Sequence, residues 1–280
     1  FSRVYLEITN CCNLACSFCP GTTRRAAFLT VAQFTHLAGA LRGQTRFLYF
    51  HVMGEPLLHP DLPELLDIAG RMGFRVVLTT NGTLLPKRQR ELLAAQALHK
   101  VSVSLHSFEA NSGVDMEHYL AGCTDFGLAA SEAGILIDYR LWNLDGAETR
   151  GRNEQNDAIL NHLHAAYPGN WTQNTWGWRL CDRTFIHYGE KFDWPSPDAP
   201  DHGEAGTCRA LRDQLAVLCD GTVVPCCLDG EGRIPLGNLL AQPLDEILAA
   251  EPARSIAAGF ALQKRLHPLC RRCGYAQRFR

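Results

Sequence analysis

The spacing of hydrophobic and polar residues changes repeatedly along the first part of the chain. Short apolar runs of strand length occur at residues 3–9, 46–53, 74–80, 100–105 and 135–141. Between them, apolar residues recur three and four positions apart, which predicts amphipathic helices at residues 30–41, 61–72, 86–97, 115–133 and 153–166. This alternation favours parallel strands joined by right-handed helical crossovers. A sixth strand is expected near residues 176–180.

Five or six such strand–helix units are too few to close an eight-stranded barrel, so the first part of the chain is predicted to form an open α/β sheet. Thr30 is expected to begin the first helix, with Gln33 completing a capping box. In parallel sheets of this kind, functional residues lie in the loops beyond the carboxyl ends of the strands.

The pattern changes in the last third of the chain. Residues 188–207 are rich in Pro, Asp and Gly and are predicted to form a linker. Beyond it, residues 214–226 are expected to form a hairpin with Asp220-Gly221 as its two-residue turn. The predicted domains are therefore residues 1–187 and residues 208–280. Two short helices are expected in the second domain, at residues 244–250 and 253–263.

Composition narrows the class of protein. The chain has 280 residues and a formal net charge of −2, which argues against binding to long nucleic acid. No apolar run approaches the roughly 20 residues of a membrane span, and the first residues lack a signal-peptide pattern. The 12 cysteines gather in two groups, unlike the pattern of a disulfide-rich secreted protein. We therefore expect a cytoplasmic protein, with no membrane association, whose cysteines bind metal.

Cys12, Cys16 and Cys19 follow the first predicted strand at CxxxCxxC spacing. Thiolates are the ligands that iron–sulfur clusters require, and three so close together can hold one cluster. A [4Fe-4S] cluster with three protein ligands keeps one iron open for a further ligand. A zinc knuckle is the alternative that these residues leave open.

This spacing, with Phe18 directly before the third cysteine, resembles the radical S-adenosylmethionine (SAM) superfamily. In that family SAM binds the open iron, and an electron from the cluster cleaves it to methionine and a 5′-deoxyadenosyl radical. Gly54-Glu55-Pro56, after the second predicted strand, supports the resemblance, although Met53 stands where the family has a glycine. The resemblance implies a partial (β/α)6 TIM-like barrel that is open at one side.

The resemblance also implies which residues bind SAM. The Gly-Glu-Pro tripeptide is expected to hold the SAM amino group, and the aromatic residue in the cysteine loop to contact the adenine. A serine and an arginine match in position the residues that bind the ribose and carboxylate of SAM. The implied SAM-binding residues are Phe18, Gly54, Glu55, Pro56, Asn81, Ser104 and Arg140.

Polar residues alternate along three of the predicted strands. In a barrel the face covered by helices is apolar, so these polar residues are expected to line the lumen where SAM and substrate bind. A solvated strand face is the alternative. His106, Asp138 and Glu7 are predicted to be catalytic or to face the substrate. The alternating residues are Glu7 and Thr9, then Ser102 and Ser104 followed by His106, and finally Asp138 and Arg140.

The C-terminal cysteines form a second pattern, which resembles the first half of a SPASM domain, known as a twitch domain. It consists of one cysteine, a Gly-x4-Cys hairpin that begins at Gly221, and a CxxC pair. The resemblance implies one auxiliary [4Fe-4S] cluster that passes or accepts an electron, since its irons are all bound by protein. A zinc site is the alternative, and Cys227 competes with Cys226. The implied ligands are Cys208, Cys226, Cys270 and Cys273.

Together these features predict a radical SAM enzyme that abstracts hydrogen from a small polar substrate such as a sugar, aminocyclitol or nucleoside. The outcome is oxidation by a dehydrogenase or bond cleavage by a lyase, including release of a modified base in nucleoside salvage. The alternatives are a maturase that modifies a ribosomally made peptide and a non-catalytic metal-binding scaffold. The chain has no room for a peptide-recognition domain before the first strand, which favours the small substrate. A flavodoxin- or ferredoxin-like electron donor is the expected partner.

Overall fold

A curved parallel sheet forms the centre of the fold. The computed structural model describes residues 1–110, 115–144 and 154–279. Within them, each central strand hydrogen-bonds to the next in parallel orientation. In spatial order these strands are β1 (Arg3–Leu6), β2 (Phe47–Tyr49), β3 (Arg75–Thr80), β4 (Leu98–Ser104), β5 (Leu136–Leu144) and β8 (Thr184–Glu190).

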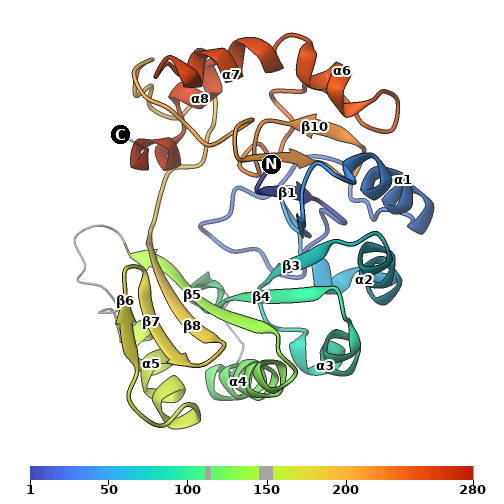
Figure 1. The fold of residues 1–280 in the computed structure, drawn as a ribbon. Coiled ribbons are helices and arrows are strands. Elements are labelled where there is room, and N and C mark those ends of the chain that lie inside the picture. Colours follow the sequence, from blue (N-terminus) through green and yellow to red (C-terminus); the bar gives the residue numbers. More distant parts are fainter. Residues whose placement is uncertain (111–114, 145–153, 280) are drawn as a thin grey trace.

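The helices that connect these strands lie along the outer side of the curved sheet (Figure 1). They are α1 (Val31–Leu41), α2 (Leu62–Arg71), α3 (Leu85–Ala94), α4 (Met116–Glu132) and α5 (Glu154–Ala166). On β1, Val4 and Leu6 are fully buried in the main core, whereas Tyr5 belongs to a separate apolar cluster on the inner face. The inner face is therefore the lumen, and alternate residues of each strand point into it.

The sheet stays open because its two ends are extended by different strands. At one end, β8 continues into the antiparallel strands β7 (Gly177–Cys181) and β6 (Thr172–Asn174). At the other end, β9 (Gln214–Val217) pairs in parallel with β1, followed by β10 (Thr222–Val224) and β11 (Gly237–Asn238). This arrangement confirms the partial, TIM-like barrel.

The sixth strand differs from the sequence prediction. A strand does form near residues 176–180, but it is β7, which runs antiparallel to β8. The sixth parallel strand is β8, which overlaps the start of the predicted linker, 188–207. Asn174 explains the error, because its side-chain oxygen accepts the backbone N–H groups of Trp176 and Gly177 at 2.8 and 2.9 Å. This tight turn pairs β6 with β7, so antiparallel strands precede β8 where a single parallel strand was expected.

The C-terminal part of the chain begins with the predicted hairpin, formed by β9 and β10. Its turn contains Gly221 at φ +86°, and the Asp220 carboxylate accepts the Thr222 N–H at 2.9 Å. After β11, the helices α6 (Leu244–Ala249), α7 (Ala253–Ala261) and α8 (Pro268–Arg271) lie beside this hairpin (Figure 1). The hairpin thus extends the barrel sheet and connects it to the C-terminal helices.

Local capping agrees with the sequence. Thr30 caps α1, with the Gln33 N–H donating to its hydroxyl at 3.1 Å and its own N–H donating to the Gln33 side chain at 3.0 Å. Asp115 caps α4 through the backbone N–H groups of Glu117 and His118. None of the described helices is both long enough and apolar enough to cross a membrane.

Packing between α4 and β5 depends on Gly127. A Cβ atom there would lie 2.0 Å from the Tyr139 hydroxyl oxygen and 2.6 Å from that of Tyr167. These hydroxyls hydrogen-bond to each other at 2.8 Å, so neither is free to move away. We predict that Gly127→Ala lowers the free energy of unfolding by about 1–3 kcal/mol, the usual cost of overpacking a core. Thermal unfolding followed by circular dichroism measures this.

The matched control is Gly39→Ala, a helical position in α1. A Cβ atom at Gly39 would have no neighbour within 4 Å. This substitution is expected to stabilise the chain by about 0.4–1 kcal/mol because alanine restricts the unfolded state. Equal midpoint shifts in the two variants would contradict the packing account.

Candidate functional site

The three cysteines of the CxxxCxxC motif lie on the long loop between β1 and α1. Cys12 and Cys19 are exposed, and Cys16 is partly buried. The Cys19 N–H donates to the Cys16 carbonyl oxygen at 3.0 Å, which forms a turn between these two cysteines. The loop therefore presents three thiols that a bound group can reach.

Two contacts fix this loop against the ends of β2 and β3. The Glu55 N–H donates to the Cys11 carbonyl oxygen at 2.7 Å. The Asn81 side-chain amide donates to the Asn13 side-chain oxygen at 2.9 Å. Asn81, predicted to bind SAM, thus lies directly beside the cysteine loop.

Gly54 is required by the close approach of the cysteine loop. Its φ is +77°, and a Cβ atom there would lie 2.6 Å from the Thr9 carbonyl oxygen and 2.7 Å from that of Cys11. Any side chain would push the loop away. Met53, the departure from the family pattern, keeps its backbone N–H bonded to the Glu7 carboxylate at 3.1 Å.

Glu55 is a buried carboxylate next to the cysteine loop. It accepts the Thr80 hydroxyl and the Asn81 N–H, both at 2.8 Å, and a backbone N–H of η1 (Pro56–Leu58) at 3.0 Å. Burial raises the pKa of Glu55 to about 7 in spite of these hydrogen bonds. Its charge also helps to raise the pKa of Cys12, after the larger effect of burial. A buried carboxylate beside the loop that carries three cysteines fits the amino group of a ligand.

Glu7 joins segments that are far apart in the sequence. It is fully buried, and Arg24 of the cysteine loop donates to its carboxylate at 2.6 Å. The same carboxylate accepts the N–H groups of Met53, at 3.1 Å, and Cys219, at 3.0 Å. Both oxygens are thus bonded to protein groups, and Glu7 holds the site together.

Asp138 forms the centre of a charged network in the lumen. Lys100 Nζ lies 2.7 Å from one carboxylate oxygen, His187 Nδ1 lies 2.6 Å from the other, and the Ser102 hydroxyl donates at 3.3 Å. Burial favours the neutral acid, but His187 and Lys100 outweigh it and hold the pKa of Asp138 at about 2. The carboxylate is therefore ionised at neutral pH.

His106 lies between the lumen and the cysteine loop, at the start of η2 (Leu105–Ala110). Its ring centroid is 5.1 Å from that of Phe18. Its Nδ1 lies 3.0 Å from the Arg140 carbonyl oxygen, which can only accept, so Nδ1 carries the proton and Nε2 has the free lone pair. Burial lowers the pKa of His106 to about 4, so the ring is neutral. Ser104 pairs with Arg140 in the sheet, which places it beside these residues.

Three buried nitrogen atoms on the lumen face have no hydrogen-bond partner within the described ranges. They are His51 Nδ1, Arg140 Nε and Trp142 Nε1. The Arg140 guanidinium stacks on the Trp142 ring, 3.7 Å from its centroid. Burial lowers the pKa of His51 to about 3, so that ring is also neutral. Buried polar atoms without a partner are costly, and a polar ligand would satisfy them.

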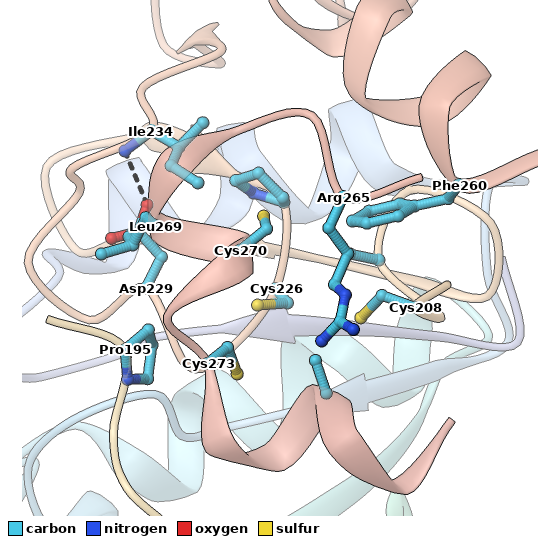
Figure 2. Close-up of a pocket in the computed structure, with 13 residues that line it drawn as sticks. Pro195, Cys208, Cys226, Asp229, Ile234, Phe260, Arg265, Leu269, Cys270 and Cys273 are labelled. Carbon is cyan, nitrogen blue, oxygen red and sulfur yellow. Dashed lines mark hydrogen bonds between the residues drawn. The ribbon is translucent and has the colours of Figure 1, made fainter. Parts of the chain in front are cut away.

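The C-terminal cysteines surround a single cavity. Figure 2 shows them around a shared space, on segments before β9, after β10 and around α8. Burial raises the pKa of all four thiols, to about 12 for Cys270 and about 11 for Cys273. Raised pKa values keep these thiols protonated, so a bound cationic centre, such as the iron of a cluster, is needed to hold them as thiolates. The residues concerned are Cys208, Cys226, Cys270 and Cys273.

The adjacent residues Cys226 and Cys227 lie in different surroundings. Cys226 lines the cavity, whereas Cys227 packs beside Tyr5 on the lumen side of the sheet. Cys227, like Tyr275, also interacts electrostatically with Arg140. The lumen thus adjoins the C-terminal cysteine site. Over the described ranges, no three His, Cys, Asp or Glu side chains are placed to hold one metal ion.

Several residues of the site were not predicted from the sequence. Lys100 and Trp142 share the inner face with Ser102 and Asp138, so extending the alternation by one position would have found them. His187 had no such signal, because β8 was not predicted. Arg24 lies on a loop, where alternation says nothing of burial, whereas His51 lies within the predicted strand 46–53 and would have been found by alternation with Tyr49.

Two family models match the chain. Residues 6–122 match the radical SAM superfamily, and residues 208–274 match the SPASM iron–sulfur cluster-binding domain. These ranges contain the two cysteine groups described above.

Curated relatives match part of the barrel. A tungsten-containing aldehyde ferredoxin oxidoreductase cofactor-modifying protein of Pyrococcus furiosus is 30% identical over 146 residues, which is 49% of this chain and 38% of that protein. A PqqA peptide cyclase of Streptomyces rochei is 34% identical over 112 residues, or 39% of this chain and 30% of that protein. The chain thus spans well under half the length of these relatives.

Solved structures match over nearly the whole chain. A structure of BtrN in complex with AdoMet and 2-DOIA has a TM-score of 0.62 at 17% identity and covers 98% of this chain and 92% of that one. At this identity the likeness establishes the fold. Fold, cysteine groups and family models agree: the chain carries a radical SAM domain at residues 6–122 and a SPASM iron–sulfur cluster-binding domain at residues 208–274, and these domains imply SAM with a [4Fe-4S] cluster in the barrel and an auxiliary cluster in the C-terminal part.

Proposed function

We propose that this enzyme removes hydrogen from a small polar substrate bound in the lumen, between its two cysteine sites. The observation that supports the proposal is the set of three unpartnered nitrogens, His51 Nδ1, Arg140 Nε and Trp142 Nε1, on the lumen face. An apolar ligand would leave them unpaired at a cost of about 1–3 kcal/mol each. A sugar, aminocyclitol or nucleoside offers hydroxyl groups to all three.

We assign the SAM end of the lumen to the residues around the cysteine loop. Cys12, Cys16 and Cys19 would hold the cluster, and Glu55 the SAM amino group, beside Asn81. When bound, this cluster and SAM together supply the radical that takes a hydrogen atom from the substrate. Gly54 and Pro56 shape the backbone around Glu55, and a glycine is the residue that this approach allows.

The remaining contacts to SAM are assigned to Phe18 of the cysteine loop and to two residues of β4 and β5. Phe18, packed against His106, is assigned to the adenine. Ser104 and Arg140 are neighbours across β4 and β5 and are assigned to the ribose and carboxylate. Arg140 is assigned to both SAM and substrate, since its charge interacts with Asp138 on β5 and with Tyr275 of the C-terminal segment.

We assign substrate binding to the charged network at Asp138. Its carboxylate is ionised, and Oδ1, which lies 2.6 Å from His187 Nδ1, has no hydrogen-bond partner among the described residues, so it is assigned as an acceptor for a substrate hydroxyl or amino group. His106 Nε2 has a free lone pair and is assigned as the acceptor of a substrate proton. Glu7, with both oxygens bonded to protein, is assigned a positioning role.

An oxidation in this site balances as follows. The carbinol carbon loses one hydrogen atom to the SAM-derived radical, the hydroxyl loses a proton to a protein base, and one electron leaves to give a carbonyl. The auxiliary site, with Cys208, Cys226, Cys270 and Cys273 as its ligands, is the nearby electron acceptor. A flavodoxin- or ferredoxin-like protein is proposed to supply the electron that cleaves SAM.

Peptide modification is the second candidate. It is supported by the similarity to a PqqA peptide cyclase and by the fold shared with SuiB, whose structure with its precursor peptide SuiA matches with a TM-score of 0.63 at 13% identity. Release of a modified base from a nucleoside uses the same hydrogen abstraction and is a variant of the first candidate. Ligand binding separates these possibilities.

The auxiliary site is tested by metal content. We predict about eight iron and eight sulfide per chain after anaerobic reconstitution, since each cube holds four. The double variant Cys270→Ala/Cys273→Ala is expected to retain about half, because it removes two of the four C-terminal ligands. About four iron per unmodified chain, together with bound zinc, would contradict the auxiliary cluster.

The separate roles proposed for the two cysteine groups give another prediction. Cys16→Ala should abolish reductive cleavage of SAM, because it removes a ligand of the cluster that contacts SAM. Cys270→Ala should leave cleavage detectable, since the auxiliary site is separate. The measurement is chromatography of 5′-deoxyadenosine formed with dithionite as reductant. Equal loss in two folded variants would speak against separate roles.

The substrate class is tested by calorimetry on the SAM-loaded enzyme with nucleosides, sugars and short peptides. For a ligand that binds, Asp138→Asn is expected to weaken binding by about 10- to 100-fold, the effect of losing a hydrogen bond to a charged group. The matched control is Asp67→Asn, an exposed aspartate on α2 that should leave binding unchanged. Tight binding by peptides alone would reject the small substrate and favour the second candidate.

A further inference from the structure

A buried arginine lies among the four cysteines of the auxiliary site. Arg265 is 4% exposed and lines the same cavity as these cysteines. Figure 2 shows its guanidinium directed into the space between Cys208 and Cys226. The residue lies between α7 and α8, outside both cysteine motifs, and the proposed function does not use it.

The chain is shaped to hold this guanidinium in place. Its Nη2 donates to the Ala205 carbonyl oxygen, and the Arg265 backbone N–H donates to the Glu204 carbonyl oxygen at 2.6 Å. Gly206 has a φ of +131°, and a Cβ atom there would lie 2.6 Å from Nη2 and 2.9 Å from Cζ. Residues 204–206 therefore form a strap that only glycine allows to pass over the guanidinium.

Two of the guanidinium nitrogens remain available. Arg265 Nε and Nη1 are buried and have no hydrogen-bond partner in the described part of the chain. Arginine stays protonated in proteins, so these are charged donors whose burial is costly unless an acceptor is present. Sulfur atoms of the cavity are the nearby acceptors.

The charged residues that line the cavity are Arg265 and Asp229, and their contacts agree with a guanidinium that faces the cysteines. Arg265 lines the cavity together with Cys208, Cys270 and Cys273, and arginine carries a positive charge at any pH at which the protein is folded. The acid that lines the cavity, Asp229, has its two carboxylate oxygens bonded to backbone N–H groups at 2.8 Å each. The positive charge of Arg265 is therefore directed to the cysteine sulfurs.

We propose that Arg265 donates its free N–H groups to the sulfur atoms of the auxiliary site and thereby raises the reduction potential of the cluster held there. Reduction adds one negative charge to a site that already contains four thiolates. A fixed, buried cation stabilises the reduced form more than the oxidised form. Arg265 would make the auxiliary site a better electron acceptor, whatever the substrate.

Potentiometry tests this role directly. The parent chain for this measurement is the 280-residue chain with Cys12, Cys16 and Cys19 replaced by alanine. In it, the auxiliary cluster is the sole source of the paramagnetic signal on reduction. We expect Arg265→Gln to lower the equilibrium constant for one-electron reduction at least tenfold, a shift of about 59 mV to lower potential. Arg265→Lys, which keeps the charge but loses the planar fork, should give a smaller shift.

The control is Arg254→Gln, which removes an arginine that is 70% exposed on α7. Its potential should equal that of the parent chain. The same potential in Arg265→Gln and Arg254→Gln would overturn the proposal, because a residue that only fixes the strap would not affect the potential.

A second measurement does not depend on a variant that retains its cluster. Guanidino-¹⁵N-labelled arginine is incorporated into the parent chain, and pulsed electron paramagnetic resonance of the reduced auxiliary cluster is recorded. We expect a ¹⁵N coupling that disappears in Arg265→Lys and persists in Arg254→Gln. No ¹⁵N coupling in the parent chain, or its persistence in Arg265→Lys, would reject the contact even if Arg265→Gln fails to assemble.

Discussion

One buried carboxylate, Glu7, holds together the parts of this enzyme that make its active site. It binds Arg24 of the cysteine loop at 2.6 Å, the backbone of Met53 after β2 and the backbone of Cys219 at the C-terminal hairpin. A buried charge is tolerated only when it is fully paired, so the contacts are mutually dependent. The position of the SAM site relative to the C-terminal hairpin follows from this interaction.

The titratable side chains of the lumen differ in charge. Asp138 is ionised and paired, whereas His51 and His106 are neutral because they are buried. Asp138 lies on β5 and His51 follows β2, so these groups lie on different sides of the lumen, as do the nitrogens without a hydrogen-bond partner among the described residues. A neutral, hydroxyl-rich molecule suits this lumen because it can both donate and accept hydrogen bonds.

The sequence predicted the parallel strands from β1 to β5 and their helices because each has a clear period, and Thr30 marks the start of the first helix. The hairpin of β9 and β10 was predicted from its turn, Asp220-Gly221. The prediction failed at β8, because β7 and β8 form a short hairpin with no helix between them, in a region rich in aromatic residues. Alternation assigned Asp138 to the lumen, but it carries no information on partners, so His187 was missed. Glu7 was placed on the correct face and predicted to be catalytic, whereas its contacts show a carboxylate already bonded to protein.

At the auxiliary site, too, the sequence predicted some residues and missed others. The resemblance to a SPASM domain implied Cys208, Cys226, Cys270 and Cys273 as ligands, and in the structure all four line one cavity. Nothing in the sequence distinguished Arg265 from surface arginines. Its burial depends on Gly206 and on the path of residues 204–206, which only the folded chain reveals.

The central claim is that the substrate pocket lies between two iron–sulfur sites. The most direct measurement is anomalous diffraction at the iron edge from crystals of the anaerobically reconstituted, SAM-loaded enzyme. The account predicts two separate iron peaks, one at Cys12, Cys16 and Cys19 and one at the four C-terminal cysteines, with the Arg140 and Trp142 side chains between them. A single iron peak, or a second peak that appears at the zinc edge instead, would contradict it.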